Sequence, residues 1–353
     1  MNVTSGRSTE SSSAGSEDSF TCRASTRADL LGHIGSGNTP QPTILMLGGF
    51  GRSGSTLLER CLAETPGAVG IGEVLHLWER ALRDNELCGC GTPFRECAFW
   101  RQIGHDAFGG WGALDGQQMI DDRADVVRTR YIPQLVTGVT PRHRRIRRDR
   151  FISKLRGLYS VTGGDGIDLI IDSSKHPAYA YLLRRMRMPL RCVLVVRDPR
   201  GVAYSWSKAV RRPEASANDE LMPRYSALET AMKWTMYGWM FHLLPAVGVP
   251  TMTVHYEDFM RNPRETLAEV LRFAGHPVDD SALAHVSEKS VHLGRHHTVA
   301  GNPMRFKTGD VTLVLDDEWK SKMEPLPRVV VGLVTIPSRA AYAIQRRFSR
   351  FRS

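Results

Sequence analysis

The sequence predicts an α/β fold in which helices pack around a central parallel sheet. Four short apolar runs, each typical of a strand buried on both faces, occupy residues 44–47, 69–71, 169–171 and 193–196. Helical patterns separate these runs, and parallel strands need such crossovers between them. The chain has 353 residues, of which 41% are hydrophobic, so it can bury one large core. We therefore expect a three-layer fold with the parallel sheet between two layers of helices.

The first apolar run leads through a glycine-rich loop directly into a helix. Gly51 and Gly54 belong to this loop, and glycine lets the backbone turn tightly and approach an anion. Ser55 and Thr56 begin the helix, where unpaired backbone N–H groups and the positive end of the helix dipole favour negative charge. A phosphate-like group is expected at this position.

The residues missing from the loop narrow the kind of anion. Gly49 and Gly54 have the spacing of a nucleotide-triphosphate P-loop, but Ser55 stands where that motif requires lysine. The cation lies inside the loop instead, at Arg52, whose planar guanidinium can bind two oxygens of a tetrahedral group. This pattern favours a transfer reaction with no obligatory metal over a kinase.

A second anion site is predicted after the apolar run at residues 193–196. Arg197 follows this strand, Asp198 suits the N-cap of the next helix, and Pro199 suits its first position. Arg197 and Ser205 are eight positions apart. Both can therefore reach one phosphate in the crevice above the sheet, where open parallel sheets bind ligands.

Together, residues 51–58 (GRSGSTLL) and 197–205 (RDPRGVAYS) resemble the 5′-phosphosulfate loop and the 3′-phosphate motif of the sulfotransferases. The resemblance covers residues 43–319. It implies a P-loop-like fold with helical insertions that binds 3′-phosphoadenosine 5′-phosphosulfate (PAPS) without a metal. By this resemblance the 5′-phosphosulfate is held by Arg52, Ser53, Gly54, Ser55 and Thr56. The 3′-phosphate is held by Arg197 and Ser205.

Two later segments agree with the resemblance. Residues 254–260 (VHYEDFM) look like the family's strand and turn ahead of a helix. Residues 300–307 (AGNPMRFK) resemble the cofactor-closing loop of bacterial sulfotransferases. This second likeness implies donor contacts for Arg305 and Lys307, and a cation on a surface loop is the alternative for Arg305.

Sulfuryl transfer needs a base for the acceptor hydroxyl and a cation for the charge that develops on the leaving oxygen. Glu73 follows the apolar run at residues 69–71, in a Gly-Glu pair that resembles the base position of tyrosylprotein and several bacterial sulfotransferases. Lys175 resembles the lysine of a Lys-Thr-His-Leu-Pro segment in the cytosolic enzymes, which implies contact with the bridging oxygen or the leaving phosphate, and Arg52 is the second cation. His176 is the rival base, but its spacing departs from that segment by one residue.

Six cysteines are too few and too scattered for a disulfide scaffold. Cys88, Cys90 and Cys97 are close enough in sequence to share a metal or to form one bridge. A three-cysteine zinc site would need a fourth ligand, for which His76 or His105 could serve. We prefer a structural loop without metal, in which Cys88 or Cys90 is bridged to Cys97.

The chain is expected to divide into a leader, one large domain and a C-terminal helix. Residues 1–41, rich in Ser, Thr, Gly and charge, are predicted to be disordered, and residues 42–325 to form the sulfotransferase-like domain. Residues 109–163 are predicted to form a basic helical insertion, which lacks the interleaved aromatics that would favour nucleic-acid binding. Residues 326–353 are predicted to form a basic amphipathic helix that docks on the core or contacts an anionic membrane.

Two classes of function stay open. The first is a cytoplasmic sulfotransferase, with peripheral contact at the inner membrane surface, that acts on a hydroxyl of a small-molecule, lipid or glycan acceptor. The net charge of +10 suits a donor with several negative charges. The alternative is a non-catalytic nucleotide-binding protein that retains the anion sites. The presence of Glu73 and Lys175 favours the enzyme. The sequence does not identify the acceptor, because variable loops build the acceptor pocket in such folds.

Overall fold

The computed structural model describes residues 41–164, 166–209, 223–279 and 281–350. The predicted leader lies outside the described residues except for Gln41. The strands are β1 (Thr43–Gly48), β2 (Ala68–Gly72), β3 (Leu169–Lys175), β4 (Leu190–Val196), β5 (Thr251–His255), β6 (Ser290–Leu293) and β7 (Gly309–Thr312). The α-helices are α1 (Ser55–Ala63), α2 (Ala98–Phe108), α3 (Gly116–Val126), α4 (Ile132–Thr137), α5 (Arg142–Thr162), α6 (Pro177–Leu183), α7 (Pro199–Ser207), α8 (Ala227–His242), α9 (Tyr256–Arg261), α10 (Pro263–Ala274), α11 (Trp319–Lys322), α12 (Pro325–Val334) and α13 (Ile336–Arg350).

The predicted α/β fold is confirmed. Strands β1 to β5 form one parallel sheet in the order β2-β3-β1-β4-β5, and β6 and β7 form a separate antiparallel pair. Each of the four predicted apolar runs is a strand, and each strand extends beyond its run. β1 therefore lies at the centre of the sheet, between β3 and β4.

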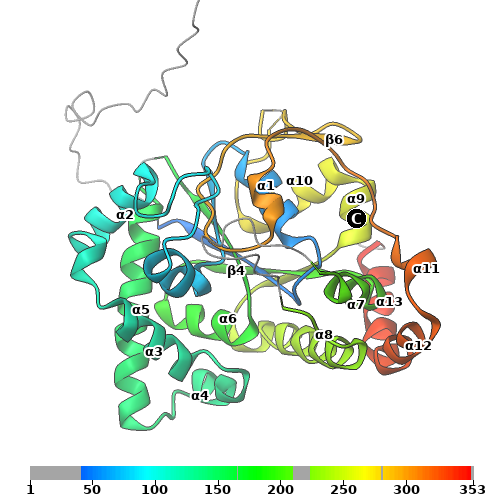
Figure 1. Ribbon diagram of the computed structural model, residues 1–353, viewed down its shortest axis with the longest axis horizontal. Coiled ribbons are helices and arrows are strands. Elements are labelled where there is room, and N and C mark those ends of the chain that lie inside the picture. Colours follow the sequence, from blue (N-terminus) through cyan, green and yellow to red (C-terminus); the bar gives the residue numbers. More distant parts are fainter. Residues whose placement is uncertain (1–40, 165, 210–222, 280, 351–353) are drawn as a thin grey trace, which may run out of the picture. The chain divides into compact units, whose positions relative to one another are not determined.

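Alternate residues of β1 enter two different cores, as the period of a strand requires. Ile44 and Met46 pack in a core with side chains from α2, α5, α6 and α8. Leu45 and Leu47 pack in a second core with α1, α9 and α10. In Figure 1, α1, α9 and α10 cover one face of the sheet and α6 and α8 the other. The result is the expected three-layer arrangement.

The register of the sheet brings the carboxyl ends of the strands to one edge. Gly48 at the end of β1 pairs with Lys175 of β3 and with Leu194 of β4. The glycine-rich loop follows Gly48, Glu73 follows the last residue of β2, and Arg197 follows the last residue of β4. Segments that are far apart in the chain thus begin from one line, which is the crevice where open α/β sheets bind ligands.

Two expectations about the later elements are corrected. In the segment 254–260 the strand ends at His255, the last residue paired with β4, and the short helix α9 stands where a turn was expected, whereas the helix expected after it does begin, as α10, at Pro263. The C-terminal segment contains two helices, α12 and α13, rather than one. Pro337 explains the break, because proline has no N–H to donate within a continuous helix but suits the first turn of a new one.

The basic insertion is helical, as predicted, and part of its charge is used internally. Arg150 of α5 donates two hydrogen bonds to the buried Asp122 of α3, each 2.6 Å long. Arg147 of α5 pairs with Asp125 of α3. These pairs hold α3 against α5, so the arginine run serves packing between helices as well as solvation.

A buried carboxyl group, Glu59, ties helix α1 to the sheet. Its side chain accepts a hydrogen bond from the Gly72 N–H of β2 and another from the Ser173 hydroxyl of β3, both 2.6 Å long. Glu59 is 1% exposed. Burial raises the pKa of Glu59 from 4.5 to about 7, and the two hydrogen bonds oppose this rise.

We predict that Glu59 makes the stability of the protein depend on pH. Because its pKa is higher in the folded state, its contribution is fully present below pH 4.5 and is lost as the pH rises through about 7. Glu59→Gln cannot titrate, and its amide can accept from the Gly72 N–H through oxygen and donate to the Ser173 hydroxyl through nitrogen, so the free energy of unfolding should fall less steeply between these values. Denaturant titrations at several pH values measure this slope. The exposed Glu288→Gln is the matched control, and equal slopes in all three proteins would contradict the prediction.

Candidate active site

The glycine-rich loop and the uncapped start of α1 form a candidate anion cradle. Gly54 occupies the N-cap position with a left-handed backbone (φ 89°), and no side chain of the described residues caps this end of the helix. Ser53 donates its hydroxyl to the Phe50 carbonyl at 2.7 Å, which fixes the loop from within. Ser55 and Thr56 begin the helix. The first N–H groups of α1 are therefore available for an anion.

Helix α7, which follows β4, supports this loop from outside. The Trp206 indole N–H donates to the Gly51 carbonyl at 3.0 Å. A Cβ atom at Gly51 would lie 2.7 Å from the Trp206 ring, so only glycine fits there without a shift of the ring. The Arg52 guanidinium lies 5.1 Å from the centre of the same ring. The two predicted anion motifs are thus in contact through Trp206, a residue that the sequence analysis did not assign to the site.

Arg197 also contacts the loop, but it has an acidic partner. Its Nη1 donates to the Arg52 carbonyl at 3.2 Å. The central carbon of its guanidinium lies 4.7 Å from the centre of the Tyr256 ring, in a cation–π contact. Its Nη2 bonds the Asp316 carbonyl at 2.8 Å and lies 2.9 Å from the Asp316 carboxylate. Ser205 lies half-buried further along α7. An incoming phosphate at Arg197 would therefore have to displace Asp316 or share the guanidinium with it.

A pocket adjoins Arg197 at the carboxyl ends of β4 and β5. Its cationic lining comes from Arg197, Arg200, Arg261, Lys320, Arg339 and Arg346. Trp319 and Tyr342 supply aromatic surface. Several lining cations are paired, such as Arg200 with Asp198 at 2.6 Å. The pocket is thus suited to an anionic ligand with an aromatic ring, although its acidic side chains offset part of the positive charge.

Glu73 and Lys175, from the ends of β2 and β3, form a close ion pair. The Lys175 Nζ lies 2.5 Å from the Glu73 Oε1, and each side chain is 15% exposed. His76 lies on the other carboxylate oxygen, with Nε2 3.8 Å from Oε2. Burial acts to raise the pKa of Glu73, but the charges of Lys175 and His76 and the lysine hydrogen bond outweigh it and lower the pKa overall. Glu73 is ionised at neutral pH.

A buried polar network holds the end of β3 behind this pair. Asp172 accepts hydrogen bonds from the Ser174 N–H at 2.8 Å and from the Ser174 hydroxyl at 2.5 Å. The Tyr159 hydroxyl donates to the same carboxyl group. The Ser174 hydroxyl accepts the Leu75 N–H at 3.1 Å, which links β3 to the turn after Glu73. These polar residues at the end of β3 thus support the turn that carries Glu73.

His176, the rival base, follows Lys175 in the chain and occupies the N-cap position of helix α6, where its side chain makes no capping hydrogen bond. Its Nδ1 is buried and has no hydrogen-bond partner among the described residues. The ring meets the Tyr237 ring edge-on at 5.5 Å. Burial lowers the pKa of His176 to about 4, so the imidazole is neutral at pH 7. A neutral imidazole can accept a proton, and His176 therefore stays a candidate.

The structure does not favour the expected donor contact of Arg305, whose guanidinium is bound by backbone carbonyls, and the donor contact of Lys307 stays a prediction. Arg305 is 1% exposed, and its guanidinium donates to the carbonyls of Thr298 and Leu87, each at 2.8 Å. These contacts indicate a structural role, because a fully buried cation must be satisfied by the groups around it. Lys307 is exposed, and its carbonyl accepts a hydrogen bond from Arg60 of α1 at 2.8 Å. The segment 300–307, which resembles a cofactor-closing loop in sequence, is thus packed against the rest of the protein through Arg305 and the Lys307 carbonyl.

Comparisons with known proteins give a family. The family model described as "Sulfotransferase family" matches residues 42–280. Among solved structures, the sulfotransferase domain of the Synechococcus PCC 7002 olefin synthase has 19% identity and a TM-score of 0.42, covering 85% of this chain and 96% of that one. The sulfotransferase domain from the curacin biosynthetic pathway has 16% identity and a TM-score of 0.44, covering 86% and 99%. Sulfotransferase STF1 from Mycobacterium tuberculosis H37Rv has 15% identity and a TM-score of 0.39, covering 68% and 69%. No curated protein matches the chain.

We predict that Lys175 keeps the pKa of Glu73 low. Lys175→Met removes the charge, so burial should then raise the pKa of Glu73 above its unfolded value. The native pair contributes stability above the unfolded pKa, and this is lost as the pH falls through the folded pKa. In the variant the trend reverses: the contribution of Glu73 is present at low pH and is lost as the pH rises. At neutral pH, the uncompensated carboxylate should cost about 3–5 kcal/mol.

Unfolding free energies measured across the acidic and neutral range compare the two proteins. The control is Lys233→Met, which removes a more exposed pair with Glu229 and should cost about 1 kcal/mol or less. A Lys175→Met variant with the native pH dependence would show that Lys175 does not control the charge of Glu73.

Proposed function

This chain belongs to the sulfotransferase family, and from that premise we propose that it transfers a sulfuryl group from PAPS to a hydroxyl of a small-molecule, lipid or glycan acceptor. The observation that carries the proposal is the Glu73–Lys175 pair at the same sheet edge as the anion cradle. The charge of Glu73 also acts on Arg52 of the cradle: burial lowers the pKa of Arg52, and Glu73 opposes that effect. The proposed base, cation and anion site thus share one edge of the sheet.

In the proposed donor complex, the cradle binds the 5′-phosphosulfate. The N–H groups at the start of α1 and the residues Arg52 to Thr56 surround the phosphate and sulfate oxygens. Arg197 and Ser205 bind the 3′-phosphate at the adjoining end of β4, once Asp316 gives up its pair with Arg197. Arginine and backbone N–H groups can neutralise these oxygens, so the proposal requires no metal.

The proposed reaction is a direct displacement at sulfur. The acceptor oxygen forms a new bond to sulfur while the bond from sulfur to the bridging phosphate oxygen breaks. The acceptor proton passes to Glu73, and the electron pair of the broken bond leaves with 3′-phosphoadenosine 5′-phosphate. Lys175 and Arg52 stabilise the negative charge that grows on the bridging oxygen.

The ion pair of the free protein gives Lys175 a second task in this proposal. While Lys175 is bound to Glu73, the carboxylate is a weak base because its pKa is lowered. A donor that draws the ammonium group toward its bridging oxygen frees Glu73 from that charge and raises its basicity. Donor binding would therefore prepare the base for the acceptor.

The location of the reaction is proposed to be the cytoplasm, with contact at an anionic membrane surface. No helix in the described part of the chain is long and apolar enough to cross a bilayer. Helices α12 and α13 expose apolar side chains beside arginines; the apolar ones are Leu326, Val329, Leu333, Ile336 and Ile344. An amphipathic pair of this kind can lie in the plane of a membrane surface and would suit a lipid acceptor.

The proposal is tested by supplying PAPS labelled on sulfur together with acceptor extracts. Small metabolites, glycans and lipids in anionic vesicles form separate arms, and the label is followed into products. Sedimentation of the protein with the vesicles tests the membrane contact in the same experiment. Binding of the donor without a labelled product in any arm would favour the non-catalytic nucleotide-binding protein.

We predict that 3′-phosphoadenosine 5′-phosphate raises the melting temperature far more than AMP or ATP. Ligand binding to the folded state stabilises it, and only the first compound can occupy the 3′-site. Arg197→Ala should remove most of this difference, since a charge-assisted contact contributes roughly 1.5–3 kcal/mol. Arg191→Ala, at the other end of β4, is the control and should keep it. Magnesium is left out of the buffer, and no chelator is added. Equal shifts with AMP in the native protein would remove the 3′-site from the proposal.

We predict that Glu73→Gln lowers turnover by roughly 10²–10⁴-fold, the usual contribution of a general base, with donor affinity retained. His176→Ala should act mildly, and the exposed Glu288→Gln should have no effect. Rates are measured on the labelled product at saturating donor. If His176→Ala abolishes turnover while Glu73→Gln stays active, the base is His176. If both variants stay active, neither residue is the base.

A further inference from the structure

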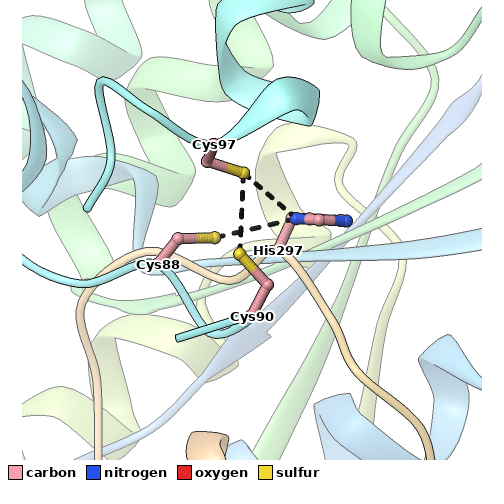
Figure 2. A group of neighbouring side chains, drawn as sticks. All are labelled: Cys88, Cys90, Cys97 and His297. Atoms are coloured by element: carbon pink, nitrogen blue, oxygen red, sulfur yellow. Dashed lines mark hydrogen bonds between the residues drawn. The ribbon is translucent and has the colours of Figure 1, made fainter. Parts of the chain in front are cut away.

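Three cysteines and one histidine, which no step of the proposed reaction uses, converge at one point. These residues are Cys88, Cys90, Cys97 and His297, and their potential ligand atoms all lie within 4.8 Å of one another. The Cys97 and Cys88 sulfurs are 3.2 and 3.8 Å from the His297 Nδ1, and the sulfurs of Cys90 and Cys97 are 3.8 Å apart. In Figure 2 the three sulfurs and the imidazole nitrogen face a common centre.

The three separations given are close to those between the corners of a tetrahedral zinc site, and the limit of 4.8 Å on the others is about 1 Å wider. Zinc bonds sulfur at about 2.3 Å and nitrogen at about 2.0–2.1 Å, which in a tetrahedron places two sulfurs about 3.8 Å apart and sulfur and nitrogen about 3.6 Å apart. A disulfide would require about 2.05 Å between sulfurs. The five cysteines of the described residues are all free, so the expected bridge to Cys97 is wrong.

The fourth ligand is also different from the two histidines considered from the sequence. His105 pairs with Asp106 on the surface, where its side chain is 77% exposed. His76 lies beside Glu73 and Arg123 in the candidate active site. His297 comes instead from a segment 200 residues after Cys97. Its ring stacks on Phe99 at 4.8 Å and an angle of 11°, which fixes the orientation of its Nδ1.

The backbone around the cluster is held as a metal-binding loop would need. The Gly91 N–H donates to the Cys88 carbonyl at 2.8 Å, which closes a tight turn between the first two cysteines. The Gly89 N–H donates to the Thr298 carbonyl at 2.9 Å. The Trp100 indole donates to the His297 carbonyl at 2.7 Å. The two segments thus meet through contacts that do not involve the four side chains themselves.

We propose that Cys88, Cys90, Cys97 and His297 bind one Zn²⁺ ion in a closed structural site. Four protein ligands fill a tetrahedral shell and leave no open position for a substrate, which is the pattern of structural rather than catalytic zinc. Thiolate and imidazole ligands select zinc over the hard cations magnesium and calcium. Cys88 and Cys97 are buried and Cys90 and His297 half-buried, so solvent has limited access to the ion.

The ion would fix a segment on which the position of Glu73 depends. Val299 lies two residues after His297. Its carbonyl accepts a hydrogen bond from the Glu73 N–H at 2.8 Å, and its N–H donates to the Ile71 carbonyl at 3.1 Å. The buried Arg305 joins the same segment to the cysteine loop through Thr298 and Leu87. Zinc would therefore stabilise the domain and position the end of β2, without touching the substrate.

The first test is the metal content of protein purified with reductant and without chelator. We expect about one zinc per chain by elemental mass spectrometry. Cys90→Ser and His297→Ala should lose most of it, while Cys61→Ala and Cys192→Ala, which alter free thiols outside the cluster, should retain it. The zinc-loaded native protein should also melt higher than the protein after chelation, and zinc should restore the difference.

The second test uses native protein only, so that a misfolded variant cannot decide the result. Co²⁺ exchanged for zinc should give the sulfur-to-metal absorption and the visible bands of a tetrahedral thiolate site. The proposal is overturned if native protein, after reduction and addition of zinc, binds no metal or gives no thiolate absorption. It is also overturned if Cys90→Ser and His297→Ala bind as much metal as the controls, or if thiol titration shows a disulfide in the cluster. None of these measurements depends on sulfuryl transfer.

Discussion

The parallel pairing of β1 with β3 on one side and β4 on the other is the constraint on which the candidate site depends. It places Gly48 beside Lys175 and Leu194, so the cradle after β1, the lysine at the end of β3 and Arg197 after β4 start from the same edge. A strand that is buried on both faces resists a shift of register, because a shift by one residue would exchange its two apolar cores. The site is thus positioned by the packing of the sheet.

Buried ionic groups then attach the surrounding segments to this edge. Arg60 of α1 donates to the carbonyls of Met304, Arg305, Gly294 and Lys307. Glu59, the preceding residue, binds the opposite way, into β2 and β3. Helix α1 therefore holds both the sheet and the late loop, and its uncapped first turn is left for an anion. Arg305, which the sequence suggested as a ligand-binding cation, and Arg60 instead bind backbone carbonyls and hold the fold together.

The Glu73–Lys175 pair and the cysteine cluster are connected through one short segment. Val299 forms a parallel bridge with Gly72 directly before Glu73, and His297 lies two residues earlier. The carboxylate is consequently held from two sides, by Lys175 through charge and by Val299 through the backbone. In the proposed reaction, a donor that attracts Lys175 would restore the basicity of Glu73, so donor binding and the base would depend on each other.

The sequence alone was sufficient for features that depend on near neighbours in the chain. These are the strand, glycine-rich loop and helix around Arg52, the Asp198 cap with Pro199, and the apolar runs of the sheet, because a turn, a cap or a buried strand is determined within a few residues. Only the tertiary structure decided which distant groups meet. It joined His297 to three cysteines, buried Arg305 beneath carbonyls and set Asp316 against Arg197. Local periodicity contains no information about partners that are more than 100 residues away, since sheet register and helix packing determine those contacts.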